Sequence, residues 1–421
     1  MSDAVPLPPR PSLEQYKKLA KDFHSVCQSG DPGAVRKWSE RWVEDIARRQ
    51  GIAILRRDID RRAKRMEQRW RAFEKTCRLA DAQFFLAREH GFASWPKFAR
   101  HVAGLAGANS PVSNFEAAAD AIVTGDAAAV QKLLHDDPEL VRARSTREHR
   151  STLLHYVSAN GIEDFRQKTP KNIVAITNLL LDAGADVNAE SDAYGGRSTT
   201  LGLAATSVHP QRAGVQIALL QTLLDRGAKI GGASMISACL ANGQPEAAEF
   251  FASLGVPMDL VAAAALGRLD VVQRDLDENN LASEAYLYGC GYGRTDVVAF
   301  LLDNGIDPGL QNDEGQTGLH LAAYGAHLDL VRLLLQRGTP IGVKDTHYHA
   351  TPLEVALWAW DHTDDAPKRE RCYEVVALMA RAGAILDPES WRDPADETPG
   401  TLGKIQSDPR MLSALRGEIS G

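Results

Sequence analysis

Five side chains between residues 155 and 209 could take part in proton transfer or bind a charged group. They are His155, Tyr156, Tyr194, Arg197 and His209. A general base needs only hydrogen-bond reach to the proton that it removes, so the histidines and tyrosines are candidates for acid–base chemistry. The chain has no phosphate-binding glycine loop, no G-x-S-x-G elbow and no set of kinase motifs around them. We therefore assign no catalytic residue, and a small-molecule enzyme or binding protein is the alternative function.

Two stretches of the same region read as lengthened turns, at residues 161–172 and 206–213. Long loops that carry polar residues are often functional. We expect these turns, and the polar loops beside them, to converge into a cationic edge that binds an anion or a carboxylate. The alternative is that the extra residues only decorate the fold. The candidate edge residues are Arg147, His149, Arg150, His155, Tyr156, Arg166, Lys168, Lys171, Tyr194, Arg197, His209 and Arg212.

Aromatic residues recur near the ends of successive apolar stretches in the last third of the chain. Large aromatic rings are common anchors of protein recognition, because they bury much area at little cost in rotamer entropy. Nearby acidic residues at positions 313, 314, 361, 364 and 365 favour a basic partner. Alternatively, Trp358 and Trp360 pack inside the protein or beneath the turn of residues 361–369. The predicted protein-binding residues are Tyr292, Tyr324, Trp358, Trp360, Asp313, His347 and Tyr348.

A histidine pair at His347 and His349 is a weak metal signal. No cysteine lies near the pair, and structural zinc sites are built from cysteine and histidine together. We read the pair as part of an exposed turn. The sequence therefore predicts no metal site and no cofactor.

The elements that must position these residues repeat along the chain. From residue 111 onward, a short apolar helix, a tight turn, a second apolar helix, a glycine and a polar loop follow one another. The closing glycines, such as Gly305 and Gly338, which are 33 residues apart, let the chain leave a helix through a left-handed residue. An acidic residue before two apolar residues marks the expected start of a second helix, at Asp270, Asp296 and Glu374 among others.

These patterns resemble the ankyrin repeat family. The sequence Gly-Gln-Thr-Gly-Leu-His-Leu-Ala-Ala at residues 315–323 is close to the family pattern G-x-T-P-L-H-x-A-A, with Gly318 in place of proline. Partial copies begin at Thr152 and Thr351. The resemblance covers roughly residues 114–387 and implies an all-α ankyrin-repeat solenoid whose usual role is protein binding. It also implies that His155 and His320 tie neighbouring loops together by hydrogen bonds.

We expect about eight helix-turn-helix units, which stack to form one elongated core and a concave groove. The units between residues 232 and 281 are short and have lost the turn that would form a β-hairpin finger. The expected starts lie near Asn114, Ser145, Ala189, Gly232, Pro257, Leu281, Gln311 and Asp345.

Three regions are expected: a basic helical domain at residues 1–110, the repeats at 111–387 and an extension with one short helix at 388–421. Residues 79–98 resemble the helical segment that precedes the repeats in a group of bacterial ankyrin proteins. The aromatic residues of this segment are expected to cover the exposed end of the first repeat. They are Phe84, Phe85, Phe92, Trp95 and Phe98.

The charge of the 421-residue chain is uneven. The formal total is −7, yet residues 1–110 hold 22 Lys and Arg against 13 Asp and Glu, a formal charge of +9. A basic block at residues 48–78 can hold phosphates, an anionic lipid or an acidic protein surface. The alternative is a solvated helix face whose arginines pair with carboxylates three or four residues away, or a segment that docks on the acidic remainder of this chain. No helix-turn-helix signature, zinc-finger spacing or RNA-binding motif accompanies the block, which disfavours a nucleic acid partner.

Five scattered cysteines and the absence of a long apolar window indicate a cytoplasmic protein without a membrane span. We expect no disulfide framework, and we expect Cys239 and Cys290 to be core thiols. The function predicted from the sequence is a scaffold that presents a groove and a loop edge to a protein or peptide partner.

Overall fold

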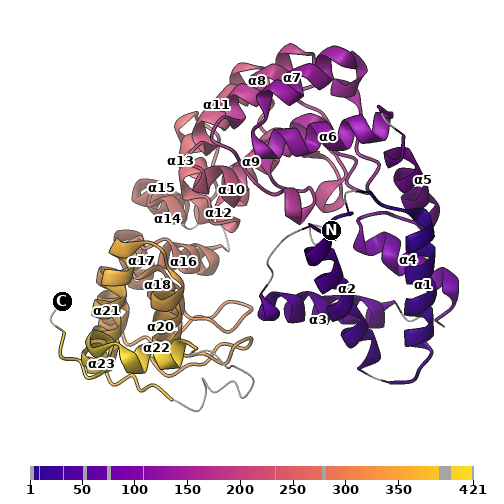
Figure 1. The fold of residues 1–421 in the computed structure, drawn as a ribbon. Coiled ribbons are helices and arrows are strands. Elements are labelled where there is room, and N and C mark those ends of the chain that lie inside the picture. The colour runs from indigo at the N-terminus through magenta and orange to yellow at the C-terminus, as the bar shows by residue number, and fades with distance from the viewer. Residues whose placement is uncertain are drawn as a thin grey trace. The chain divides into compact units, whose positions relative to one another are not determined.

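The computed structural model describes residues 4–8, 10–31, 33–50, 55–73, 77–107, 109–232, 234–276, 281–387 and 400–419, most of which are helical (Figure 1). The chain forms two compact units. Unit 1 comprises residues 1–231 and 242–247, and unit 2 comprises residues 232–241 and 248–421. The division at residues 110 and 387 that the sequence predicts stays a prediction.

Unit 1 opens with five helices that enclose their own aromatic core. Phe23 stacks on Phe85 with ring centroids 4.8 Å apart, and the rings of Trp38 and Trp70 pack against Phe23 at 4.6 and 4.9 Å. Such aromatic pairs add stability beyond the area that they bury. The helices are α1 (Leu13–Cys27), α2 (Ala34–Gln50), α3 (Arg56–Ala72), α4 (Leu79–Glu89) and α5 (Trp95–Leu105).

The expectation that the aromatic residues of this domain cover the first repeat is largely wrong. Phe85 lies in the core of the five helices, and Phe98 packs in a second cluster with Tyr16 and Val102. The domain is large enough to bury these rings by itself. The loop of residues 144–152, called a finger below, makes polar contacts with this domain: Arg88 pairs with Glu148, and the Nδ1 of His101 lies 2.7 Å from the Oγ1 of Thr146.

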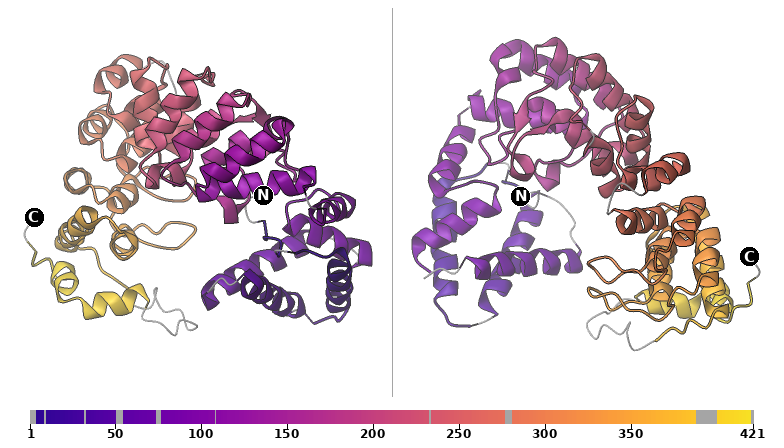
Figure 2. Two further views of the ribbon diagram at one scale, coloured as in Figure 1. Left: turned by 45° about the horizontal axis from the view of Figure 1, so that its top comes forward. Right: turned by 180° about the vertical axis from the view of Figure 1, so that it is seen from behind.

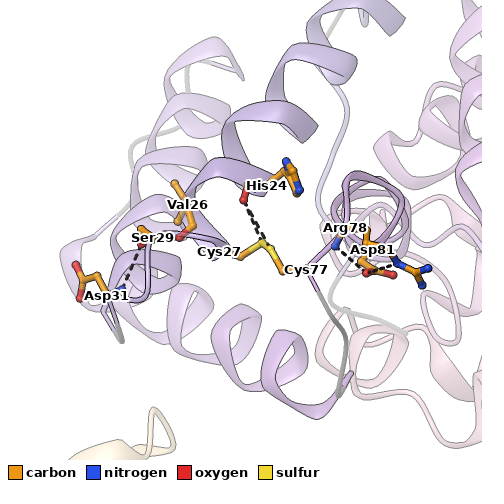
Figure 3. Close-up of a disulfide and its surroundings, with 8 residues drawn as sticks. All are labelled: His24, Val26, Cys27, Ser29, Asp31, Cys77, Arg78 and Asp81. Carbon is orange, nitrogen blue, oxygen red and sulfur yellow. Dashed lines mark hydrogen bonds and ion pairs between the residues drawn. A yellow bond between two sulfur atoms is a disulfide. The ribbon is translucent and has the colours of Figure 1, made fainter.

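A disulfide joins two of these helical segments (Figure 3). Cys27 ends α1 and Cys77 lies just before α4, with their Cα atoms 6.2 Å apart. The prediction of unpaired cysteines is therefore wrong for this pair. Cys239, Cys290 and Cys372 are free and buried, and burial raises the pKa of Cys239 to about 12 and that of Cys372 to about 11. The prediction that Cys239 and Cys290 are core thiols is confirmed.

The remainder of unit 1 holds three helical pairs with two lengthened connections. Residues 190–199 form a finger with a two-stranded antiparallel sheet, in which Glu190 pairs with Thr199. The elements are α6 (Pro111–Thr124), α7 (Ala127–Asp136), η1 (Pro138–Arg142), η2 (Leu153–Ser158), η3 (Asp164–Arg166), α8 (Ile173–Asp182), β1 (Glu190–Ser191), η4 (Ala193–Gly195), β2 (Ser198–Thr199), α9 (Thr200–Ala205), α10 (Val208–Arg212) and α11 (Gln216–Asp225), where η denotes a 3₁₀ helix.

Unit 2 continues the pattern with five pairs and a terminal pair. In both views of Figure 2 the loops that precede α18 and α20, in orange, project from the same side of their helices. The elements are α12 (Ser234–Ala241), α13 (Pro245–Ser253, whose first residues belong to unit 1), α14 (Leu260–Leu266), α15 (Leu269–Asp275), α16 (Ala282–Gly291), α17 (Thr295–Asp303), α18 (Gly318–Gly325), α19 (Leu328–Gln336), α20 (Pro352–His362), α21 (Ala366–Arg381), α22 (Thr401–Ser407) and α23 (Pro409–Leu415).

Eight helical pairs within the described residues match the predicted units, and the histidine links are confirmed. The Nδ1 of His320 accepts from the Thr317 amide at 3.0 Å, so its Nε2 carries the proton and donates to the Ala350 carbonyl at 3.2 Å. His155 makes the same bonds to Thr152 and Ser198. Each histidine thus connects its own loop to the loop of the next repeat.

Two details differ from the expectation, and the structure explains a third that the sequence already shows. Glu374 lies inside α21, which begins at Ala366 because Asp365 and Pro367 start it earlier, so the turn before it is only Thr363–Asp365. The terminal extension has two helices, α22 and α23, rather than one, and its residues 388–399 lie outside the described residues. Gly318 replaces the usual proline because a Cβ there would lie 2.7 Å from the Cys290 sulfur and the Tyr286 hydroxyl.

Candidate functional site

The lengthened loops of unit 1 turn their charges inward. η3, in the long connection before α8, and the finger of residues 144–152 each direct one arginine against α6, and both arginines are buried. Arg147 pairs with Glu116 at 2.6 Å and with Glu163 at 2.9 Å. Arg166 pairs with Glu116 at 2.8 Å and with Asp120 at 2.7 Å. We call Glu116, Arg147, Glu163 and Arg166 the buried ion network.

Mutual neutralisation makes this burial tolerable. Burial by itself raises the pKa of Glu116, but Arg147 and Arg166 outweigh it and hold that pKa at about 2. The same two arginines keep the pKa of Glu163 well below its usual range against the effect of burial. Removing one partner from such a group leaves an uncompensated charge in a region of low dielectric. The network therefore joins the two loops to α6.

The predicted cationic edge is divided by this arrangement. Its buried members face the protein interior instead of an open edge. The acidic residues of α6 and the long loop pair with the two arginines, whereas His155 bonds to the loops around it. Others stay outside, where Lys171 donates to the Ala213 carbonyl at 2.7 Å and Tyr194 donates to Asn160 at 2.6 Å. The buried members are Arg147, His149, His155, Tyr156 and Arg166, and the exposed or half-exposed members are Arg150, Lys168, Lys171, Tyr194, Arg197, His209 and Arg212.

Two of the acid–base candidates in these loops are buried. His155 and Tyr156 are completely buried, and both ring nitrogens of His155 are engaged with Thr152 and Ser198. Burial lowers the pKa of His155 to about 4 and raises that of Tyr156 far above its usual value. Tyr194, in contrast, is 69% exposed. His155 and Tyr156 are therefore enclosed by the protein, whereas Tyr194 and the half-exposed His209 reach the surface.

In unit 2, exposed aromatic rings lie near the C-terminal ends of α18 and α20, each of which is the first helix of its repeat. Tyr324, near the end of α18, stacks on Trp358 of α20, with ring centroids 6.0 Å apart and planes at 21°. Trp358 stacks in turn on His362, at 4.3 Å and 10°. Tyr324 is 51% exposed and Trp358 is 45% exposed. We call Tyr324, Trp358 and His362 the aromatic column.

A lysine of the neighbouring helix approaches the aromatic column. The Nζ of Lys368, in α21, lies 4.7 Å from the centre of the Tyr324 ring, which is a cation–π contact. Lys368 is half-buried, and this burial lowers the pKa of its ammonium group. The ring faces at this surface therefore already attract a cation of the protein itself.

The fingers before α18 and α20 form a second, separate surface. Asp345 is buried and accepts hydrogen bonds from the amides of His347 at 2.9 Å and Tyr348 at 2.6 Å, which leaves both side chains outside. The His347 and Tyr348 rings meet edge to face at 4.4 Å. The Thr346 amide donates to the Glu314 carbonyl at 2.8 Å, which ties this finger to the finger that carries the exposed Asp313. The fingers precede the first residues of the helices, whereas the aromatic column lies near their last residues.

Two aromatic residues of the predicted binding surface are not free to bind. Trp360 is only 7% exposed and packs edge to face on Tyr373, because residues two apart on a helix point to different sides. The Tyr292 ring is partly buried, and its hydroxyl donates to the Leu240 carbonyl at 2.5 Å. Asp361, expected on the acidic rim, instead pairs with Lys404 at 2.5 Å.

Three residues that contribute to these surfaces were missed from the sequence. His362 follows Trp358 by four residues, which places both on one face of a helix, and this spacing could have identified it. Asp345 two residues before His347 is the spacing of a carboxylate that caps a turn. Lys368 could not have been found, because its contact with Tyr324 depends on how two repeats stack.

Two further features are absent from the described residues, a metal-binding cluster and a membrane-spanning helix. No three histidine, cysteine or acidic side chains there come together in a way that could hold a metal ion. Within the same residues, no helix combines the length and the hydropathy needed to cross a membrane.

Comparison with known proteins identifies the repeats. The family model described as ankyrin repeats (many copies) matches residues 301–356, which include α18 and part of α20. The ankyrin repeat-containing protein P1E11.10 of Schizosaccharomyces pombe is 42% identical over 53 residues, 13% of this chain and 26% of that protein. Mouse serine/threonine-protein kinase TNNI3K is 28% identical over 160 residues, 34% of this chain and 18% of that protein. Zebrafish inversin is 36% identical over 76 residues, 17% of this chain and 7% of that protein. The matched segments span about a quarter or less of these relatives. The chain contains ankyrin repeats, which the family model places at residues 301–356.

Proposed function

We propose that unit 2 binds a protein or peptide partner through the aromatic column. Ankyrin repeats are generally protein-interaction modules. The observation that carries the proposal is the continuous exposed stack of Tyr324, Trp358 and His362. Burial of a large apolar ring is favourable, so a partner that covers these exposed rings gains binding free energy.

The partner that best fits this surface is a peptide segment with a basic side chain. Lys368 already occupies a face of the Tyr324 ring, so the attraction for a basic side chain comes from nearby carboxylates and not from the ring faces. Asp364 and Asp365, directly after α20, are exposed and add negative charge near the column. Charge complementarity of this kind mainly sets partner choice and association rate. The cytoplasm is the proposed location on the basis of the three free, buried cysteines, whereas the Cys27–Cys77 disulfide counts against it.

The test is selection of peptides from a displayed library of random linear sequences on the full chain. Selected peptides should bind the wild type and lose affinity for the Tyr324→Ser/Trp358→Ser variant by about 2 kcal/mol, roughly thirtyfold, as for a central aromatic anchor. A Tyr348→Ser variant is the matched control, since it removes an exposed aromatic ring from the finger surface. Equal binding by the double variant, or loss of binding only in the Tyr348 variant, would refute the aromatic column as the site.

A further inference from the structure

A small cavity lies between the N-terminal segment, α1 and α2. Its volume is about 80 Å³, whereas an apolar cavity that holds benzene measures about 150 Å³. Only a few non-hydrogen atoms of a ligand therefore fit inside it. Gln15 and Arg49 are exposed, so the cavity is open to solvent on their side. The lining residues are Pro8, Gln15, Tyr16, Leu19, Trp42, Asp45, Ile46 and Arg49.

The spacing of the lining residues explains the two helical walls. Trp42, Ile46 and Arg49 follow one another at intervals of four and three residues, so they lie along one face of α2. Tyr16 and Leu19, three residues apart, share one face of α1. Most of the side chains on these two faces are apolar, and they provide the surface that an apolar ligand needs.

The hydroxyl group of Tyr16 has no hydrogen-bond partner among the described residues, although this side chain is only 6% exposed. Polar groups of buried side chains are normally hydrogen-bonded. Burial raises the pKa of this hydroxyl, and the nearby Arg49 acts against the rise. Because Arg49 also lines the cavity, the hydroxyl lies on the cavity side of the ring. A ligand oxygen in the cavity can therefore form the hydrogen bond that the protein does not supply.

Ring contacts hold Tyr16 in place. Its ring meets the rings of Phe98 and His90 edge to face, with centroids 4.8 and 5.2 Å apart. The ring of Trp42 also contacts His90, at 5.6 Å. The Nδ1 of His90 donates to the Val5 carbonyl at 2.7 Å, which fixes the segment that leads to the cavity. A ligand therefore meets a wall that is already ordered, and binding costs little conformational entropy.

The two charged residues of the cavity neutralise each other. The Nε of Arg49 lies 2.6 Å from the carboxylate of Asp45, with which Arg48 also pairs. A charged ligand would give up hydration and would face one like charge of this pair. The cavity therefore favours an uncharged ligand.

We propose that this cavity binds a small uncharged organic molecule, which places a short apolar chain or ring against α1 and α2 and an oxygen against the Tyr16 hydroxyl. Alcohols, ketones and amides have this chemistry. The apolar part would cover Leu19, Trp42 and Ile46, and burial of apolar surface would provide most of the affinity. The site lies in unit 1 and is independent of the aromatic column.

The test is an NMR titration of the full chain with n-butanol, in which the indole N–H resonances of the tryptophans are followed. The Trp42 resonance is identified by its loss in the Trp42→Phe variant. Trp38, identified in the same way, is the reference, because it belongs to the same helix but does not line the cavity. We expect the Trp42 shift to saturate in the millimolar range, as for a very small ligand, and the Trp38 resonance to move less.

Tyr16→Phe keeps the aromatic ring and removes the hydroxyl. Its affinity for n-butanol should be about fivefold lower, as for the loss of one neutral hydrogen bond. Tyr348→Phe is the matched control, since it removes an exposed tyrosine hydroxyl outside the cavity. Ile46→Phe is a second variant in case Tyr16→Phe does not fold. Its larger side chain should fill the cavity and abolish the saturable shift.

Butyrate and n-butylammonium test the preference for an uncharged ligand, because they carry the same short chain with a charge. Both should bind at least about tenfold more weakly than n-butanol. Four outcomes would overturn the proposal. They are absence of a saturable Trp42 shift, equal affinities of the wild type and the Tyr16→Phe variant, binding of a charged compound as strong as that of n-butanol, and equal shifts of Trp38 and Trp42, which would indicate a general effect of the solvent.

Discussion

The loops of unit 1 bury charged side chains, whereas the helix ends of unit 2 leave aromatic side chains exposed. In unit 1, two arginines and two glutamates lie buried against one another, although charged residues are normally exposed. In unit 2, a tyrosine and a tryptophan remain about half exposed, although such rings are normally covered. Each exception has a local cause: complementary charges on α6 in one unit, and a short turn that leaves the rings uncovered in the other. The difference shows that neighbours, more than residue type, decide which side chains of a repeat can meet a partner.

Removal of one cation from the buried ion network should cause the largest loss of stability. Replacement of Arg147 by alanine leaves Glu116 and Glu163 without one of their partners. We therefore expect the free energy of unfolding to fall by about 3 to 5 kcal/mol. Urea unfolding followed by circular dichroism measures this change. The exposed Arg150, changed to alanine, is the control and should shift stability by less than about 0.5 kcal/mol. Similar effects of the two substitutions would mean that the network is not buried as described.

A second experiment compares the two tryptophans of α20. The Trp360→Ala variant leaves a cavity beside Tyr373 and should lose about 3 kcal/mol of stability. The Trp358→Ala variant should lose less than about 1 kcal/mol, because almost half of this ring is already in water. Thermal unfolding separates the two variants. A larger loss for Trp358 would contradict its place in an exposed column.

Acid should weaken unit 1 through its buried histidines. Burial lowers the pKa of His101 to about 4 from an ordinary value of 6.5. The unfolded chain therefore takes up a proton at this residue at a higher pH than the folded chain, and stability falls as the pH drops from 6.5 towards 4. Between pH 7 and pH 5 the loss from His101 should be roughly 2 kcal/mol. Urea unfolding at the two pH values measures this loss.

The matched variant for the acid experiment is His101→Asn, whose amide can replace the Nδ1 contact with Thr146. Its stability should change less between pH 7 and pH 5 than that of the wild type. His90, whose pKa burial lowers to about 3, keeps titrating in both proteins. An unchanged pH dependence in the variant would show that His101 is not the group responsible.

The smallest expected effect concerns the finger surface. Asp345→Ala removes the acceptor of several amide hydrogen bonds in one loop and should cost about 1 kcal/mol, as for the loss of a capping side chain. The exchange of the Tyr348 amide with deuterium should become faster. Peptides selected on the aromatic column should bind the variant normally, because the two surfaces lie at opposite ends of their helices. A loss of such binding would show that the two surfaces act together.

Repeat architecture was readable from the sequence because its signals are local. The Thr-x-x-His phrase, the closing glycines and the apolar pairs behind Asp296 and Asp329 each lie within a few residues, and the structure has helices where these signals predict them. The start of α21 was missed because Asp365 and Pro367 form an earlier start signal than Glu374. Local patterns fix such elements within a turn or two of helix.

The candidate site could be predicted only in part, because it depends on contacts between distant residues. The aromatic positions Tyr324 and Trp358 were identified from the spacing of repeats, but Trp360 faces the core. The inward turn of Arg147 and Arg166 depends on Glu116, which lies 31 and 50 residues earlier in the chain. No motif in the sequence records that pairing.

The histidine links described above also bear on how each unit unfolds. Because His320 reaches the Ala350 carbonyl and His155 reaches the Ser198 carbonyl, the loss of one finger removes a hydrogen-bond acceptor from the repeat before it. In a linear array the energy of such nearest-neighbour contacts, added to the stability of each repeat, determines cooperativity. Local opening of residues 345–351 should therefore spread towards α18 instead of staying confined to its own loop. Within each unit, these imidazoles couple the folding of one repeat to that of the next.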